Sequence, residues 1–414
     1  MVGQSRDSVV ESGHGTEGTG ATAADVLGGY LHARAAEFLR GLRAHAESAG
    51  SAESAAETAV AVETLRAAAR RLNGALHTYR PLLDPAWADQ LRTELSWLSG
   101  TLAREYAYAA RLDRLLTALH RLASGARDGG PDRGTTTARA GAADRNGAGD
   151  RDGAGSKDGA GTRGGGDKGA GDKGGAGEKG GAGRKGVEGE RGAERGALPV
   201  GAARAGALLD RQLTLSRTRA HSAALGALGS ARFHAVADAV AVLASEVPFR
   251  RDTKETADRP APGVLVPLAE QARRQLTEAV GGLPLTRAGA PYNAEALSRS
   301  LAAEARQDAA WHQVRVLLRL HRYALEVLGP HAEGDSRLVP ACAALDRHRE
   351  AAEAAAAAAS AAATPRIAPA SAYALGVLHA DQRHEVEAAR FAFGRLWGRT
   401  QVPSRAPSAR GEAL

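Results

Sequence analysis

One pattern of arginines occurs twice in this chain, and it constrains the fold more than any other feature of the sequence. The matched positions are Glu63 with His312, Arg66 with Arg315, Arg70 with Arg319, and Ala75-Leu76 with Ala324-Leu325. Because an α-helix turns by about 100° per residue, the charged positions of each copy fall within an arc of roughly 80°. The repeat therefore predicts two helices that each present a row of arginines on one face, and this favours an anionic ligand.

The rest of the sequence also shows helical periodicity, apart from one glycine-rich segment in the middle. Apolar residues recur at helical spacing from Ala23 to about Ser124 and again from near Ala202, and no β-pattern of comparable length appears. We therefore predict an all-α protein. The predicted segments are a disordered tail (1–22), a first helical half (23–125), a disordered insert (126–198), a second helical half (199–399) and a disordered tail (400–414).

The predicted insert has almost no side chains that could form a core. Glycine, alanine and alternating Asp, Lys and Arg dominate it, and such a composition cannot offset the entropy of ordering the chain. Glycine occupies every third position from Gly171 to Gly192, as in a collagen triple helix, but these triplets contain no proline. We predict a flexible linker, with a triple helix as the alternative.

Charge and composition narrow the class of partner. The formal net charge is +7 and the pI is near 9.8, which favours an acidic partner. Five of the six lysines lie in the insert, so the positive charge elsewhere is mostly arginine. The planar guanidinium fork suits phosphate oxygens, although a GC-rich genome would produce the same bias. Aromatic residues make up only 4% of the chain. This disfavours a nucleic-acid partner bound by base stacking.

The sequence argues against an enzyme and against a membrane protein. Cys342 is the single cysteine, and His379 and His384 lie five residues apart, which misses the geometry of a zinc-binding pair. No His-Glu-x-x-His, Walker lysine loop or Gly-x-Ser-x-Gly occurs. We expect no catalytic residue, no metal and no cofactor. Met1 to Thr22 lacks the apolar region of a secretory signal, and no apolar run is long enough for a membrane span. We therefore expect a cytoplasmic protein.

The second copy of the repeat, with its leading histidine, resembles the CHAD domain family (conserved histidine α-helical domain). The residues that carry the resemblance there are His312, Val314, Arg315, Arg319, Arg322, Tyr323, Ala324, Leu325 and Glu326. The first copy contributes Arg66, Arg70, Arg71 and Leu72, and the segments Leu82-Leu83-Asp84-Pro85 and Leu95-Ser96-Trp97-Leu98 also look like family landmarks. His348, in Leu345-Asp346-Arg347-His348, resembles a further family histidine.

Three positions depart from the family pattern. Glu63 stands where the family has a histidine, Asn73 stands where an arginine is usual, and Tyr106-Ala107-Tyr108-Ala109 stands where an acidic cluster is usual. Since a carboxylate repels a polyanion, these departures predict an asymmetric binding groove. We expect the half that contains His312 to bind more strongly.

The resemblance implies two helical bundles related by pseudo-twofold symmetry, facing each other across a basic groove that binds inorganic polyphosphate. The implied ligands for polyphosphate are Arg66, Arg70, Arg71, His312, Arg315, Arg319, Arg322 and His348. We therefore predict a non-catalytic polyphosphate-binding protein, associated with polyphosphate granules. The alternative is a degenerate helical interaction scaffold that has lost this binding.

Each predicted ligand also has a purely structural interpretation. Rows of arginine occur on ordinary solvated helix faces, and Glu63 could pair with Arg66 and Arg70 from the same helix. His312 and His348 could instead make hydrogen bonds to neighbouring helices. The position of both rows in the folded chain decides between these interpretations.

Overall fold

The computed structural model describes residues 21–48, 55–128, 185–288, 304–332 and 334–398. Within these ranges the protein is all-α, as the sequence predicts, with no strand and two isolated β-bridges. The helices are α1 (Ala23–Ser48), α2 (Ala55–Thr78), α3 (Pro85–Asp128), α4 (Lys185–Leu228), α5 (Ala231–Leu243), α6 (Lys254–Ala257), α7 (Ala261–Gly281), α8 (Leu285–Ala288), α10 (Glu304–Leu328), α11 (Leu338–Ala362) and α12 (Pro369–Gly398). Short 3₁₀ helices lie at Arg80–Leu82, Arg251–Thr253 and Gly329–His331.

The helix ends differ from the predicted segment boundaries in the middle of the chain. Helix α3 continues to Asp128 and α4 begins at Lys185, so both helices extend into the range 126–198 that was assigned to the insert. The remainder of that range, 129–184, lies outside the described residues, and so do most of the two predicted tails.

Two helix starts follow directly from the local sequence. At α1 the backbone N–H of Asp25 donates to Thr22 Oγ1 at 3.1 Å, and the backbone N–H of Thr22 donates to Asp25 Oδ2 at 3.1 Å. This reciprocal arrangement is a capping box. At α3 the backbone N–H of Trp87 donates to Asp84 Oδ1 at 2.9 Å, with Pro85 in the first helical position.

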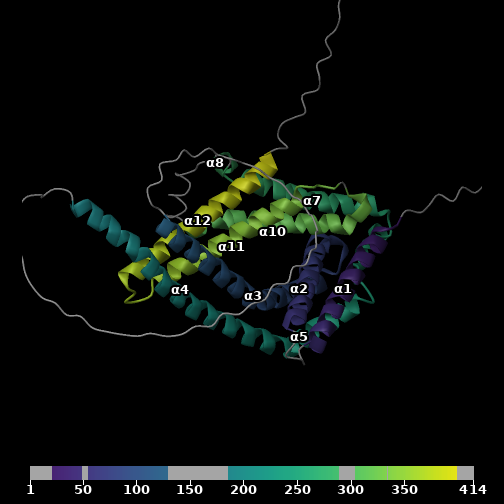
Figure 1. Ribbon diagram of the computed structural model, residues 1–414. Coiled ribbons are helices and arrows are strands. Elements are labelled where there is room, and N and C mark those ends of the chain that lie inside the picture. Colours follow the sequence, from purple (N-terminus) through teal and green to yellow (C-terminus); the bar gives the residue numbers. More distant parts are fainter. Residues whose placement is uncertain (1–20, 49–54, 129–184, 289–303, 333, 399–414) are drawn as a thin grey trace, which may run out of the picture.

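The long helices lie around the centre of the molecule, on two sides and at one end. Figure 1 shows α7, α10, α11 and α12 along one side, with α3, α4 and α5 along the other and α1 and α2 at one end. A large buried cluster joins α1, α2 and the first part of α3 to α5, α7 and the end of α10. A second cluster joins the later part of α3 to α4, α11 and α12. Both cores therefore contain residues from the two halves of the sequence.

The two basic helices cross at equivalent positions of the repeat. Gly74 follows Glu63 by 11 residues, and Tyr323 follows His312 by 11 residues. A Cβ atom added at Gly74 would lie 2.5 Å from Tyr323 Cδ2. Next to this contact, the buried Tyr79 hydroxyl donates to the Ala324 carbonyl oxygen at 2.9 Å. The close approach fixes the crossing of α2 and α10, the two helices that carry the arginine rows.

Replacing Gly74 by alanine is expected to destabilise the protein by about 1–3 kcal/mol, because the added methyl group overpacks the helix crossing. Gly100 of α3 is the matched control, since a Cβ atom there meets nothing within 4 Å. Gly100→Ala should stabilise the protein by up to about 1 kcal/mol through helix propensity. Urea unfolding of the two variants measures both changes, and equal effects would contradict the tight crossing.

Candidate functional site

Helix α10 presents one pair of arginines, and Asp346 of α11 binds both. Arg315 Nε donates to Asp346 Oδ1 at 2.6 Å, and Arg319 donates to both oxygens at 2.7 Å. Trp311 and Val314 on the other face of α10 are buried in the core. A guanidinium group has five N–H donors, so the bonds to Asp346 fix the orientation of both groups without using all their donors.

Helix α2 presents a second pair in a similar arrangement. Arg66 donates to Glu63 Oε2 at 2.6 Å, and Arg70 donates to Glu63 Oε1 at 2.8 Å. The intrahelical pairing expected from the sequence is therefore confirmed. Glu63 and Asp346 each accept hydrogen bonds from both arginines of one row. Glu63 lies on the same helix as its arginines, whereas Asp346 lies on a neighbouring helix. The structure thus shows a likeness in ion pairing that alignment of the two copies does not reveal.

Arg349 of α11 brings the two rows into one electrostatic environment. Its charge lowers the pKa of Arg66 in α2 and also lowers the pKa of Arg315 and His312 in α10, in each case in addition to the larger effect of burial. Arg349 donates to Glu353 at 2.8 Å, and Arg111 of α3 binds the same carboxylate. Arg349 therefore lies within electrostatic range of both rows, and its shared bond to Glu353 links α11 to Arg111 of α3.

A further carboxylate binds the remaining predicted arginines. Glu326 of α10 accepts a hydrogen bond from Arg71 Nε at 3.0 Å and lies 3.4 Å from Arg322 Nε. The Tyr30 hydroxyl of α1 also donates to Glu326, at 3.3 Å. The bond between Arg71 and Glu326 places Arg71 of the first half directly against the second half.

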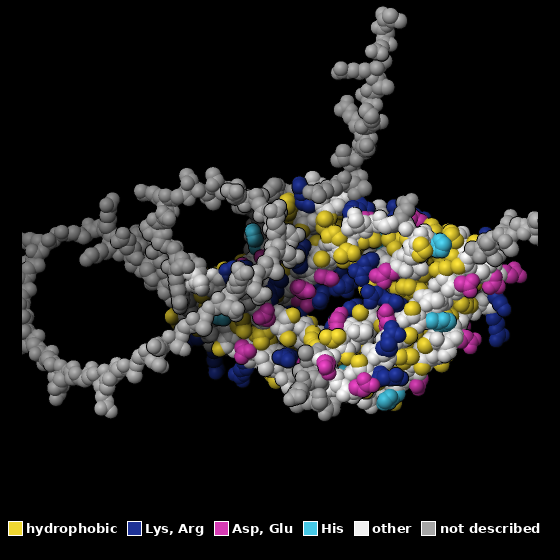
Figure 2. All heavy atoms as spheres, turned by 45° about the vertical axis from the view of Figure 1, so that its right-hand side comes forward, with side chains coloured by type: hydrophobic (Ala, Val, Ile, Leu, Met, Phe, Trp, Pro, Cys, Tyr) yellow, Lys and Arg dark blue, Asp and Glu magenta, His cyan; other side chains and the backbone are white. Residues whose placement is uncertain are grey.

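These residues form what we call the basic cluster. Its arginines are Arg66, Arg70, Arg71, Arg111, Arg315, Arg319, Arg322 and Arg349, and its carboxylates are Glu63, Glu326, Asp346 and Glu353. The eight arginines and four carboxylates of this set give a charge of 8 − 4 = +4. Figure 2 shows Arg and acidic side chains gathered around a hollow in the surface. Arginine stays protonated at neutral pH even where burial lowers its pKa, so the cluster keeps its positive charge.

His312 lies on the exposed side of α10 beside this cluster. Burial lowers the pKa of its imidazole below the ordinary value, and the charges of Arg315, Arg349 and Arg319 lower it further, while Glu353 opposes them. The imidazole is therefore neutral at pH 7. An anion that binds among these arginines would favour the protonated form.

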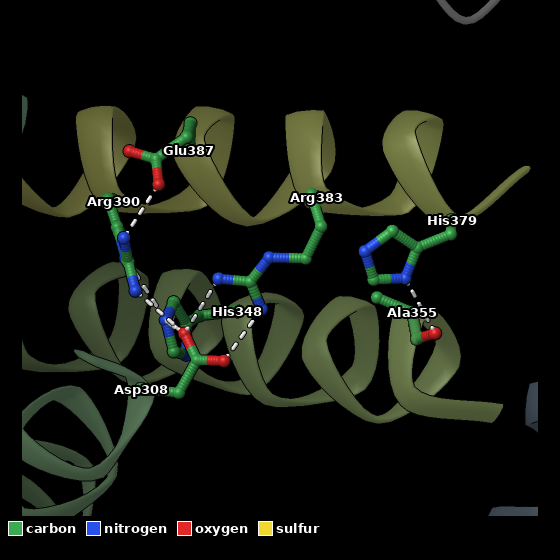
Figure 3. Close-up of polar contacts among 7 residues, drawn as sticks. All are labelled: Asp308, His348, Ala355, His379, Arg383, Glu387 and Arg390. Carbon is green, nitrogen blue, oxygen red and sulfur yellow. Dashed lines mark hydrogen bonds and ion pairs between the residues drawn. The ribbon is translucent and has the colours of Figure 1, made fainter. Parts of the chain in front are cut away.

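His348 lies in a different place from the other predicted ligands. Its side chain is only 3% exposed, it stacks on Trp311 with ring centroids 5.7 Å apart, and Arg390 Nε donates to its Nε2 at 3.3 Å. Figure 3 shows it beside Asp308, which also accepts hydrogen bonds from Arg383 and Arg390 at 2.6 Å. The imidazole ring of His348 joins α11 to α10 and α12 and is too buried for a polyanion to reach it. His348 is therefore not part of the candidate binding site.

Five members of the cluster were not predicted as site residues from the sequence, namely Arg111, Arg349, Glu326, Asp346 and Glu353. Arg349 and Glu353 have the i, i+4 spacing of a helical ion pair, but this signal is common on solvated helices. Arg111 and Asp346 carry no local signal, because their partners are 242 and 27–31 residues away in the chain. Only the packing of α3, α10 and α11 shows that these residues belong to the site.

Comparisons with known proteins show the family of the chain. The family model of the CHAD domain matches residues 33–351. The chain belongs to the CHAD domain family. The solved structure of PptA from Streptomyces chartreusis is similar to it, with 47% sequence identity over 91% of this chain and 100% of that chain and a TM-score of 0.63. The search of curated proteins found no match.

The described part of the chain lacks two further features. No helix there is long and apolar enough to cross a membrane. No group of three or more His, Cys, Asp or Glu side chains there is arranged to hold a metal ion.

Asn73 has a structural role where the family pattern usually has an arginine. Its amide nitrogen donates to the Arg92 carbonyl oxygen at 2.8 Å and to Ser96 Oγ at 2.6 Å. Both partners lie on α3, so Asn73 ties α2 to α3.

Tyr106 of α3 lies near Glu63 and Arg66, and burial is the main cause of its raised pKa.

Proposed function

We propose that this CHAD domain binds inorganic polyphosphate at the basic cluster without catalysing a reaction. The observation that carries the proposal is that the two arginine rows, at equivalent positions of α2 and α10, share one cluster with a charge of +4. Linear polyphosphate carries one negative charge on each internal phosphate. A ligand of this kind suits a row of fixed guanidinium groups better than a compact anion does.

The carboxylates of the cluster support a binding role over a catalytic one. Glu63, Asp346 and Glu353 each accept hydrogen bonds from two arginines. The oxygens of these carboxylates are already bonded to guanidinium groups and oriented toward them, so they are poorly placed to activate water as general bases. Binding of polyphosphate would also bring the protein to polyphosphate granules in the cytoplasm.

The proposed function is tested by binding of long-chain polyphosphate to the full-length protein over a range of salt concentrations. Binding releases counterions, and each neutralised charge contributes a slope of about −0.7 to the plot of log association constant against log salt concentration. For the four net charges of the cluster, the logarithm of the association constant should therefore fall by about 3 for each tenfold rise in salt. Stronger binding to heparin or to DNA than to polyphosphate would contradict the proposal. A melting temperature that polyphosphate leaves unchanged at low salt would favour the helical scaffold instead.

Affinity for polyphosphate should rise as the pH falls through the region where His312 gains a proton. The imidazole is neutral in the free protein, because burial and neighbouring arginines lower its pKa, and the bound anion raises that pKa again. Binding therefore takes up a proton, and the gain appears between about pH 7 and pH 5. Titration calorimetry of the wild type and His312→Gln measures the difference. An identical pH profile for both would contradict the role of His312.

A further inference from the structure

The carboxylates of the basic cluster share one pattern of pairing. Among the described residues, Glu63 binds Arg66 and Arg70, Asp346 binds Arg315 and Arg319, Glu353 binds Arg111 and Arg349, and Glu326 binds Arg71 and Arg322. Each unit of two arginines and one carboxylate therefore has a charge of 2 − 1 = +1. The four units lie on α2, α3, α10 and α11, so they are spread across both halves of the protein.

This pairing weakens each unit toward a small anion. A phosphate that approaches Arg315 and Arg319 must compete with Asp346, which already accepts three hydrogen bonds from these two side chains at 2.6–2.7 Å. The phosphate can use the guanidinium donors that Asp346 leaves free, but the negative charge of the carboxylate opposes its own. What remains is the attraction of a single net charge that is partly open to solvent, and such an attraction is weak.

A chain that reaches several units gains a small contribution from each. An internal phosphate carries one negative charge, which equals the net charge of one unit. The contributions add within a single molecule, because the second and later contacts form without a new loss of translational freedom. Long chains therefore exceed the threshold of detectable binding, whereas a short anion at one unit does not.

We propose that Glu63, Glu326, Asp346 and Glu353 set the minimum chain length of the polyphosphate that this protein binds. The inference rests on the proposed function, and it makes these residues determinants of specificity. They act through the arginines that they orient, with no contact to the ligand required. Glu63, which departs from the family pattern, has the same role in its row that Asp346 has in the other.

Neutralising one carboxylate at a time tests the inference. Glu63→Gln and Asp346→Asn keep the shape of each side chain and raise the charge of one unit from +1 to +2. We expect each variant to bind tripolyphosphate about tenfold more tightly than the wild type does, in titration calorimetry at one fixed salt concentration. Glu63 is 56% exposed, so its substitution is not expected to affect folding.

The control is Glu270→Gln on α7, which changes the net charge of the protein by the same amount. Glu270 pairs with Arg273 at 2.6 Å, outside the basic cluster. An equal gain in this control, or weaker binding of tripolyphosphate to both cluster variants, would overturn the inference. The proposed function fails separately, if the wild type does not bind long-chain polyphosphate.

Discussion

Replacing Arg315 and Arg319 together by glutamine is expected to weaken binding of long-chain polyphosphate by about 100-fold at low salt. Each charge-assisted hydrogen bond to a phosphate contributes about 1.5–3 kcal/mol. Glutamine keeps a neutral donor and therefore part of each contribution, and a combined loss of about 2.8 kcal/mol corresponds to a factor of 100. The salt dependence should also become shallower by about 1.4, which is about 0.7 for each lost contact. Glutamine can still donate a hydrogen bond to Asp346, which accepts from both arginines in the wild type.

The control for this double variant is Arg250→Gln/Arg273→Gln. These arginines pair with Asp252 and Glu270 outside the basic cluster and are 38% and 55% exposed. The control removes the same charge, so a general electrostatic attraction predicts equal losses in both proteins. Equal losses would contradict a localised site.

Replacing Asp308 by asparagine is expected to lower the free energy of unfolding by about 3–5 kcal/mol. Asp308 accepts hydrogen bonds from Arg383 and Arg390, whose side chains are 1% and 5% exposed. Removing the carboxylate leaves part of this buried positive charge uncompensated, and that loss is much larger than the loss of a surface ion pair. Urea unfolding measures the change.

Two controls separate this effect from ordinary charge removal. Asp89 pairs with Arg80 on the surface, where the side chains are 46% and 45% exposed, and Asp89→Asn should leave the free energy of unfolding nearly unchanged. The pH provides the second control. Burial raises the pKa of Asp308, but hydrogen bonds with His348 and Arg383 and the charge of Arg383 outweigh it and hold that pKa well below its ordinary range. The stabilisation is complete above about pH 4 and is lost as the pH falls further. Asp308→Asn and the wild type should therefore converge in acid.

The helices and the arginine rows follow from local sequence signals. The capping box of Thr22 and Asp25 explains the start of α1. The spacing of Glu63, Arg66 and Arg70 allows their ion pairs, because all three lie on one helix. The partners of Arg315 and Arg71 could not be predicted in this way. Asp346 and Glu326 reach these arginines across helix contacts, and such contacts depend on how α2, α10 and α11 pack.

His348 shows where sequence and structure differ most. Its motif resembles that of a family histidine, but α11 is rich in alanine on several faces, and Ala344, Ala351 and Ala355 are all buried. Hydrophobic periodicity cannot tell the buried side from the exposed side of such a helix. The predicted asymmetry of the groove remains a prediction. The structure adds that Glu63 has a counterpart in Asp346, so an acidic residue accompanies both rows.

We propose that the arginine rows of both halves bind one polyphosphate chain. Modification of arginine by phenylglyoxal, read by mass spectrometry with and without long-chain polyphosphate, tests this claim most directly. Arg70 of α2 and Arg319 of α10 are 29% and 27% exposed, so both are open to the reagent. We expect both to become protected over the same range of polyphosphate concentration, while Arg273 stays reactive. Protection of Arg319 without protection of Arg70, or of neither, would contradict it.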